Sequence, residues 1–351
     1  MYVDFNLLPA RLSDLVRDSG ALALAAEDDC EIEKLAELAA LPDLKHVVSL
    51  NLIELGVEDG AAKALFSSRY LTGLESLTFG DDGTEIEVLE ALAAANLPAL
   101  CHLEFQGYWS SRLAEPEVKV LGESSFKDQL HTLNLFNCGM TAESAAALCD
   151  YEWPKLRTLS LSGGYYSHNE IGAEGAAAIT SCASFDGLEV LGLSYNAIGD
   201  VGIERLSRAK GLRELHTLGL QANKLTHDGF KHWTVAEMSD QIKILDLSHN
   251  DLCERAMQYL VQSAPAELTT LTLYNNPIGD VGIRMLTRAP MSERLTYLNL
   301  AQTNITDEGG EYLLESTYLN NLEALYLDLN PGITKGMFAR LADRFGDALK
   351  A

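Results

Sequence analysis

Basic residues are scarce in this 351-residue chain. It holds 26 Lys and Arg against 51 Asp and Glu, which gives a formal net charge of −25. Nucleic acids and anionic lipids bind broad protein surfaces through Lys and Arg that replace counterions, so the composition argues against both partners. Residues 1–175 carry 29 acidic and 11 basic residues, a net of −18, and residues 176–351 carry 22 and 15, a net of −7. This charge serves either solubility or the docking of a basic partner.

Long apolar runs and signal-like segments are missing as well. No run approaches the roughly 18–20 apolar residues of a membrane-spanning helix, and residues 1–15 lack the pattern of a secretory signal. The cysteines, which form no C-x-x-C pair and no zinc-like cluster, are Cys30, Cys101, Cys138, Cys149, Cys182 and Cys253. Scattered, unpaired cysteines are typical of a reducing compartment. We expect a cytoplasmic protein, with a secreted effector as an open alternative.

Enzyme motifs are also lacking. The chain has no G-x-S-x-G, no H-E-x-x-H, no P-loop and no G-x-G-x-x-G after an expected strand. His131 and His216 occupy equivalent positions three repeats apart, so they cannot share one metal ion. Among so many carboxylates, no pair stands out as general acid and base. The sequence therefore predicts no catalytic residue, no metal site and no cofactor.

What the chain does have is an internal repeat. Eleven segments share an apolar residue at their first, fourth and sixth positions, here called slots, and all 33 of these residues are Leu, Ile, Val or Phe. The segments start at Val47, Leu74, Leu100, Leu130, Leu156, Leu188, Leu215, Ile242, Leu268, Leu295 and Leu322, about 27 residues apart. The alternation of slots four to six predicts a short strand that buries every second side chain.

Each strand segment continues in a common way. The clearest copies read N-A-I-G-D-V-G from Asn196 and N-P-I-G-D-V-G from Asn276, followed by a helical stretch. Asp near a helix start accepts hydrogen bonds from unpaired N–H groups and suits the positive end of the helix dipole. The small Gly in the first turn allows the helix to lie close to a neighbouring coil. Each repeat is thus predicted to be one strand and one helix.

The pattern L-x-x-L-x-L-x-x-N-x-I-x-D-x-G resembles that of leucine-rich-repeat proteins. The 27-residue spacing is similar to that of the ribonuclease-inhibitor-like subfamily. The resemblance implies an α/β fold, a right-handed horseshoe-shaped solenoid with a parallel sheet on the concave side and helices on the convex side. It also implies that the ninth-slot asparagines bond the backbones of neighbouring coils as a ladder. These asparagines are Asn196, Asn223, Asn250, Asn276 and Asn330.

The first half departs from this pattern. Its ninth slots hold Leu55, Asp82, Tyr108, Cys138 and Gly164, and Thr303 is the one departure later in the chain. Two coils carry insertions, after Leu100 and after Leu156. Bare ends of a solenoid need caps, so we expect one structural domain with an N-terminal segment and cap over 1–46, eleven repeats over 47–334 and a capping helix over 335–351.

Candidate contact residues come from the sheet face and the insertions. Slots five, seven and eight, which alternate with the buried leucines, are mostly small and uncharged and contain no Lys or Arg. Aromatic residues stand out among them, and Tyr and Trp are the side chains that most often dominate interface energies. The predicted partner-binding residues are Tyr108, Trp109, Phe136, Tyr165, Tyr166, His168, Tyr195, Tyr274, Tyr326 and Glu104.

Three functions remain open. We expect a non-enzymatic module that binds another protein with its concave face and rim insertions, and we expect it to be a monomer, because a capped solenoid needs no second copy. The resemblance also allows an acidic inhibitor of a basic enzyme or toxin, or a GTPase-activating protein, although no residues matching such an activator stand out. In all three cases the partner is a protein, not nucleic acid or a membrane.

Overall fold

The computed structural model describes residues 8–19, 21–25, 32–53, 59–81, 86–107, 112–165 and 169–350. The chain divides into two compact units, Met1–Glu170 and Ile171–Ala351, and each is described by itself. The boundary falls inside the repeat array, between the insertion after Leu156 and the next helix. In each unit, strands and helices alternate along the chain as the repeats predict.

The first unit contains parallel strands in sequence order. They are β1 (Leu22–Ala25), β2 (Val47–Asn51), β3 (Ser76–Asp81), β4 (His102–Gly107), β5 (Thr132–Phe136) and β6 (Thr158–Ser160). The helices are α1 (Leu8–Ser19), α2 (Ile32–Ala39), α3 (Asp59–Phe66), α4 (Ile86–Ala94), α5 (Glu115–Gly122) and α6 (Ala142–Leu148). Short 3-10 turns, at Pro42–His46, Leu71–Gly73 and Lys127–Gln129, lead into three of the strands.

The second unit repeats this order with shorter strands, again parallel. They are β7 (Val190–Gly192), β8 (Thr217–Gly219), β9 (Ile244–Asp246), β10 (Thr270–Thr272), β11 (Tyr297–Asn299), β12 (Ala324–Tyr326) and β13 (Leu349–Lys350). The helices are α7 (Gly172–Ser181), α8 (Gly199–Ser207), α9 (His227–Phe230), α10 (Glu254–Ser263), α11 (Gly279–Thr287), α12 (Asp307–Glu315) and α13 (Lys335–Phe345). The 3-10 turns are Ala183–Phe185, Lys231–Val235, Glu237–Asp240, Pro290–Arg294, Leu319–Asn321 and Gly346–Ala348.

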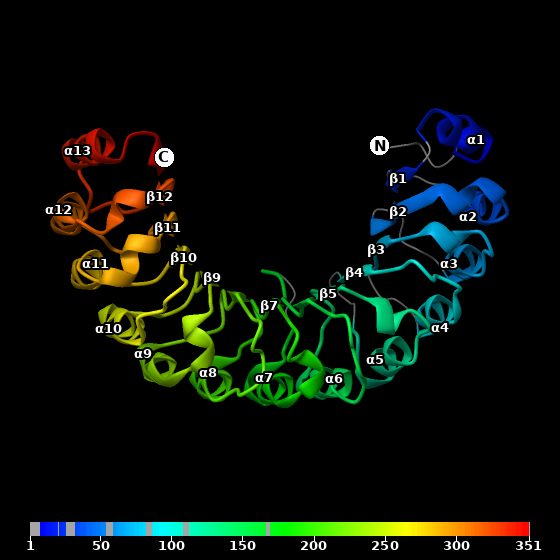
Figure 1. Cartoon of the computed structure of the whole chain (residues 1–351), viewed down its shortest axis with the longest axis horizontal. Coiled ribbons are helices and arrows are strands. Elements are labelled where there is room, and N and C mark those ends of the chain that lie inside the picture. Colours follow the sequence, from blue (N-terminus) through cyan, green and yellow to red (C-terminus); the bar gives the residue numbers. More distant parts are fainter. Residues whose placement is uncertain are drawn as a thin grey trace. The chain divides into compact units, whose positions relative to one another are not determined.

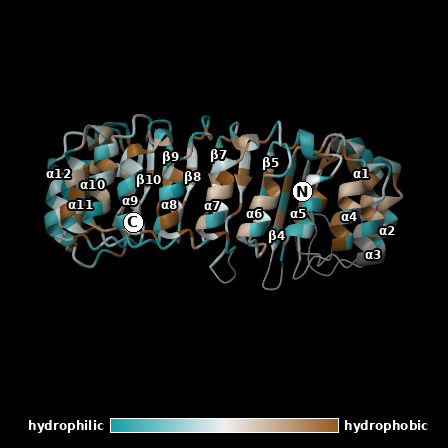
Figure 2. Cartoon of the chain, turned by 90° about the horizontal axis from the view of Figure 1, so that it is seen from below, coloured by the Kyte–Doolittle hydropathy of each residue, from teal (hydrophilic) through white to brown (hydrophobic). Residues whose placement is uncertain are grey.

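Within each unit the strands line one side and the helices cover the other (Figure 1). The core lies between them and is filled by the repeat leucines. Leu215, Leu218 and Leu220, for example, are fully buried. The helices carry apolar and polar residues side by side (Figure 2), because only one of their faces meets this core. The other face of each sheet is free for recognition, which is what positions the candidate site.

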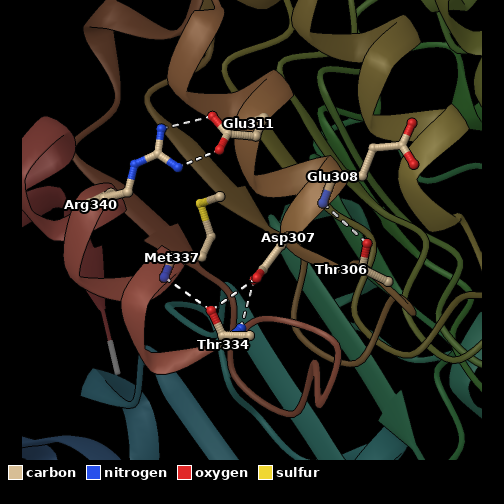
Figure 3. A network of polar contacts seen from close by, with 7 residues as sticks. All are labelled: Thr306, Asp307, Glu308, Glu311, Thr334, Met337 and Arg340. Atoms are coloured by element: carbon tan, nitrogen blue, oxygen red, sulfur yellow. Dashed lines mark hydrogen bonds and ion pairs between the residues drawn. The ribbon is translucent and has the colours of Figure 1, made fainter.

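Helix starts in the second unit are held by the preceding coil. Asp280 was expected to accept hydrogen bonds at the start of its own helix. Its carboxylate instead accepts from Thr306, through the backbone N–H (2.8 Å) and Oγ1 (2.7 Å), and from the N–H of Gly309 (3.0 Å). A Cβ on Gly309 would lie 2.5 Å from Asp280 Oδ1, so only glycine fits this approach. Asp307 bonds Thr334 in the same way (Figure 3).

The C-terminal end differs from the predicted continuous helix. Helix α13 ends at Phe345, because Gly346 takes a left-handed φ of 53°. The chain then returns to the sheet, where β13 pairs with β12 through Leu349 and Leu325. Near the N-terminal end, the strand β1 and the helix α2 precede the first predicted repeat, and Leu12 of α1 is buried.

Candidate protein-binding site

Ninth-slot asparagines connect neighbouring coils by hydrogen bonds at the turn that follows each strand. Asn223 is buried, and its Oδ1 accepts from the backbone N–H of Asn196 (3.1 Å) and of Ile198 (3.3 Å). Its Nδ2 donates to the carbonyl of Leu193 at 2.8 Å. Bonds of the same kind to the preceding coil are made by Asn196, Asn250, Asn276 and Asn330. Since buried polar groups must be satisfied, these amides fix the course of the turns.

One ladder residue was missed in the sequence. Gly164 holds the nominal ninth slot of its coil, but Asn169 does the bonding, since its Oδ1 accepts from the N–H of Met140 (2.9 Å) and its Nδ2 donates to the carbonyls of Leu161 (2.8 Å) and Leu135 (3.3 Å). The insertion displaces the asparagine by five positions. The signal was present, because N-E-I-G-A-E-G from Asn169 matches the N-A-I-G-D-V-G of a later coil.

The ladder also determines the backbone conformation of the residue that precedes each ninth slot. In the second unit, the eighth-slot residues have φ between 53° and 57°, and they are Tyr195, Ala222, His249, Asn275, Gln302 and Leu329. Non-glycine residues adopt this left-handed conformation only where the surroundings impose it. A ladder asparagine follows each of these residues except Gln302, which the buried Thr303 follows, and the hydrogen bonds of these side chains supply that constraint. Tyr195 and His249 are therefore held in a fixed backbone geometry just after β7 and β9.

The sheet face of the second unit carries an aromatic strip, which we define as Ile244, His249, Tyr274, Tyr297 and Tyr326. The ring of His249 meets that of Tyr274 edge-on at 4.7 Å between centroids, and the rings of Tyr297 and Tyr326 lie 5.4 Å apart. Ile244 is 41% exposed, a large apolar side chain in contact with solvent. Strands β9 to β12 thus present two aromatic pairs and one aliphatic residue on a rigid sheet.

Three members of the strip were not predicted, and one of them is His249, although its eighth slot was counted as part of the sheet face. Ile244 and Tyr297 occupy the third slot, which the sequence analysis did not count as part of the sheet face. The period-two alternation could have found them, because slots three and five flank the buried fourth-slot leucine, as the buried Leu245 and Leu298 show. Of the predicted residues, Tyr274 and Tyr326 fall in the strip. Tyr195 lies apart from these pairs, with its hydroxyl accepting from Gln221 Nε2 at 3.3 Å.

The Tyr297 hydroxyl lies in a partly desolvated position. Burial raises the pKa of Tyr297, and the nearby Tyr326 and Asp246 add to the increase, against a hydrogen bond with Asn299 that lowers it. The phenol therefore stays neutral across the physiological range and can both donate and accept. A neutral, partly buried Tyr cluster suits binding rather than acid–base chemistry.

Predicted residues of the first unit lie on β4, β5 and the second insertion. Glu104 of β4 is half-buried and is paired in register with Asn134. Phe136, at the end of β5, approaches Gly164 of the next coil, where a Cβ would lie 3.5 Å from Phe136 Cζ. Tyr165 follows directly and is 71% exposed. The other insertion residues, Tyr108, Trp109, Tyr166 and His168, lie outside the described residues.

Charges on the second sheet face are few and negative. In strands β7 to β12, slots three, five, seven and eight contain Asp246 and Asp328 and no Lys or Arg. Asp246 is partly used within its own turn, where its Oδ1 accepts from the N–H and the hydroxyl of Ser248. Among the described residues, no cluster of three His, Cys, Asp or Glu could hold a metal ion. Every helix described is also too short or too polar to cross a bilayer.

The family comparison agrees with the repeat analysis. The model described as a leucine-rich repeat matches residues 130–149, 188–207 and 294–314, which lie in both units. Together with the open parallel strands and their backing helices, these matches show that the chain is a leucine-rich-repeat solenoid. The comparison with curated proteins found no match to this sequence.

Solved structures of the same fold exist. A chain of the yeast Rad7 and Elc1 complex is 15% identical with a TM-score of 0.54, and the match covers 99% of this chain and 85% of that one. An internalin (inlF) from Listeria monocytogenes is 18% identical with a TM-score of 0.51, covering 91% and 94%. At these identities the likeness concerns the fold alone.

Proposed function

We propose that this chain is a non-enzymatic, ribonuclease-inhibitor-like repeat protein that binds another protein through the sheet face. The observation that carries the proposal is the aromatic strip. In it, Tyr297 and Tyr326 lie on the neighbouring strands β11 and β12, and the exposed Ile244 lies in register with Tyr297 on β9, across Thr270 of β10. Tyr side chains bury much area at little entropic cost, and rigid strands hold them ready for contact. The proposal is consistent with the yeast chain above, which was solved in a complex.

The first unit supplies a second part of the proposed interface. Phe136 lies against the coil that carries Tyr165, so the rim of that unit presents two aromatic rings near one insertion. Glu104, Tyr108, Trp109, Tyr166 and His168 remain proposed members of this part. Tyr195 remains a proposed contact residue on the sheet face of the second unit, which also carries the strip. Insertions in a repeat array map to one face, which is often the binding face.

The experiment compares capture by matched variants from an extract of the native cell. The strip variant replaces Tyr274, Tyr297 and Tyr326 by Ala. The control is Tyr312→Ala on helix α12, whose hydroxyl donates to Glu308 on the opposite side of the unit. Loss of one hot-spot side chain costs about 2 kcal/mol, or about 30-fold in affinity. We expect the strip variant to lose a partner that the wild type and the control both retain.

Folding must be equal for the result to count, so all variants are compared by circular dichroism and melting first. A folded strip variant that captures the same partner with unchanged yield would contradict the site. The double change Phe136→Ala with Tyr165→Ala then tests the first-unit part in the same assay. Retention by that variant as well would contradict the whole interface.

An acidic inhibitor of a basic protein is the second candidate, favoured by the coils of β7 to β12, whose slots three, five, seven and eight hold Asp246 and Asp328 and no Lys or Arg. Attraction between opposite charges speeds association and is screened by salt. Once the partner is known, its association rate should fall steeply as salt rises if this candidate is right. A rate that is independent of salt excludes it and leaves the aromatic contact as the basis of binding.

A further inference from the structure

A basic hollow lies away from the sheet face, where helices α7 and α8 of the second unit end. Its volume is about 520 Å³, and its lining includes Arg205, Arg208, Lys210 and Arg213. Asp186 is the one acidic residue in the lining. In a chain with two acids for every base, this local excess of cations is unusual. Residues 205–213 contain four Lys or Arg and no acid.

Two of the four cations lie within ion-pair distance of a carboxylate. Arg208 pairs with Glu204 at 2.7 Å, and Arg205 approaches Glu174 at 4.0 Å. Cations in the last turn of a helix also suit the negative end of the helix dipole. These contacts explain why Arg205 and Arg208 stand at the end of α8.

The other two cations, Lys210 and Arg213, differ in this respect. Within the described residues, neither Lys210 nor Arg213 forms an ion pair, and both side chains are exposed. Within the described part of the chain, the Arg213 side chain makes one hydrogen bond, a weak donation from Nε to the carbonyl of Lys210 at 3.5 Å. Both residues lie beyond the last residue of α8, so they do not cap it. Their charge is available to a ligand.

The shape favours an extended ligand over a small ion. A second hollow, of about 370 Å³, adjoins the first and shares Lys210, Gly211 and Arg213 with it, and Glu237 is the one acidic residue of its lining. The two unpaired cations therefore stand on a ridge that is accessible from both sides. A chain of carboxylates crossing this ridge could reach both cations at once, whereas one small anion would sit on one side.

We propose that this basic hollow binds an acidic peptide segment of a partner protein. The site is separate from the aromatic strip and opposite in charge to Asp246 and Asp328 of the sheet face. The module would then hold two partners, one on each surface. This inference does not depend on the strip, and either site can fail without the other.

The test is fluorescence anisotropy with labelled decaglutamate and the full chain. The double variant Lys210→Glu with Arg213→Glu should weaken binding about tenfold or more, since each exposed pair contributes up to about 1 kcal/mol. Asp186→Asn removes the one carboxylate of the lining and should tighten binding about twofold. The control is Arg294→Glu with Lys335→Glu, two exposed cations of the same unit, which changes the net charge equally and should leave affinity unchanged.

Three results would overturn the proposal. Equal weakening by the control pair would mean that only net charge matters. Displacement of the peptide by inorganic phosphate at constant ionic strength would assign the hollow to a small anion. Concentration-dependent self-association that disappears in the double variant would make a second copy of this chain the occupant. A strip variant with unchanged decaglutamate binding keeps this test independent of the proposed function.

Discussion

The two units use one repeat but end their strands differently. In the second unit β7 to β12 are each three residues long, and a left-handed residue follows at the eighth slot. In the first unit β3 and β4 are six residues long and run through the eighth slot without turning. At the ninth slot the second unit has ladder asparagines and, after β11, the buried Thr303, whose hydroxyl donates to the carbonyl of Leu300. The coils of β3 and β4 have Asp82 and Tyr108 at this slot. A polar side chain that hydrogen-bonds inside the turn therefore marks where the strand stops.

Intermediate coils support this reading. After β5, Cys138 replaces the asparagine, and its Sγ donates to the carbonyls of Phe105 (3.5 Å) and Phe136 (3.3 Å). The thiol donates hydrogen bonds as the amide Nδ2 does, but its sulfur is not a strong acceptor like Oδ1. Strand β5 has five residues. After β6, Asn169 restores both halves and the strand has three residues. The leucines thus make the strands, and the ladder makes the turns that shape the sheet face.

Asn223→Ala, which removes one ladder amide of the second unit, should cause the largest loss of stability. It leaves two buried N–H donors, of Asn196 and Ile198, without their acceptor and removes the bond to Leu193. Each unsatisfied buried group costs about 1–3 kcal/mol, so we expect a loss of about 3 kcal/mol or more. Urea unfolding at neutral pH measures it. The exposed Asn320→Ala serves as control and should change stability by less than about 0.5 kcal/mol.

Cys138→Ala should cost less, about 1 kcal/mol, because a thiol is a weak donor and the cavity is small. Cys138→Ser separates the two causes, since it keeps a donor of similar size for the Phe105 carbonyl. Urea unfolding of the three proteins, wild type included, gives the order. A loss as large as that of Asn223→Ala would show that the first unit depends on its ladder equally, and the comparison would fail.

The sequence predicted the strands well because their signal is local. Three apolar slots recur in every coil, and the strands of both units lie where these slots place them. The turns were harder, because one amide such as that of Asn169 can act from five residues further along. Tyr297 was missed for a different reason, since the sheet face was taken to begin at slot five. The bonding of Asp280 to the following coil depends on how coils stack, which no single repeat shows.

The basic hollow illustrates a further limit. The stretch from Arg205 to Arg213 is visible in the sequence as a local excess of cations, but net charge alone gave it no meaning in an acidic chain. Only the folded coils show that Arg205 and Arg208 approach carboxylates within ion-pair distance while, among the described residues, Lys210 and Arg213 form no ion pair. The contribution of structure is to separate charges that are used from charges that are available.

Exposed ion pairs between coils should contribute least to the stability of the fold, and Arg340 provides the test. Its guanidinium donates to both oxygens of Glu311, through Nη1 to Oε1 and through Nη2 to Oε2 at 2.8 Å, and so connects α13 to α12 (Figure 3). The hydrogen bond from Arg340 lowers the pKa of Glu311 below its ordinary 4.5. The stability that the pair adds is present above the ordinary value and is lost as the pH falls through the lowered one.

Arg340→Gln should therefore lower the melting temperature slightly at pH 7, and the difference from wild type should shrink as the pH falls through the lowered pKa of Glu311, because the carboxyl is then protonated. Because both side chains are exposed, the effect should be much smaller than that of Asn223→Ala. Arg255→Gln, an exposed change on α10, serves as control for the lost charge. A difference that stays constant as the pH falls would mean that the Arg340 stem stabilises α13 by packing, and that surface ties between coils act through contact rather than charge.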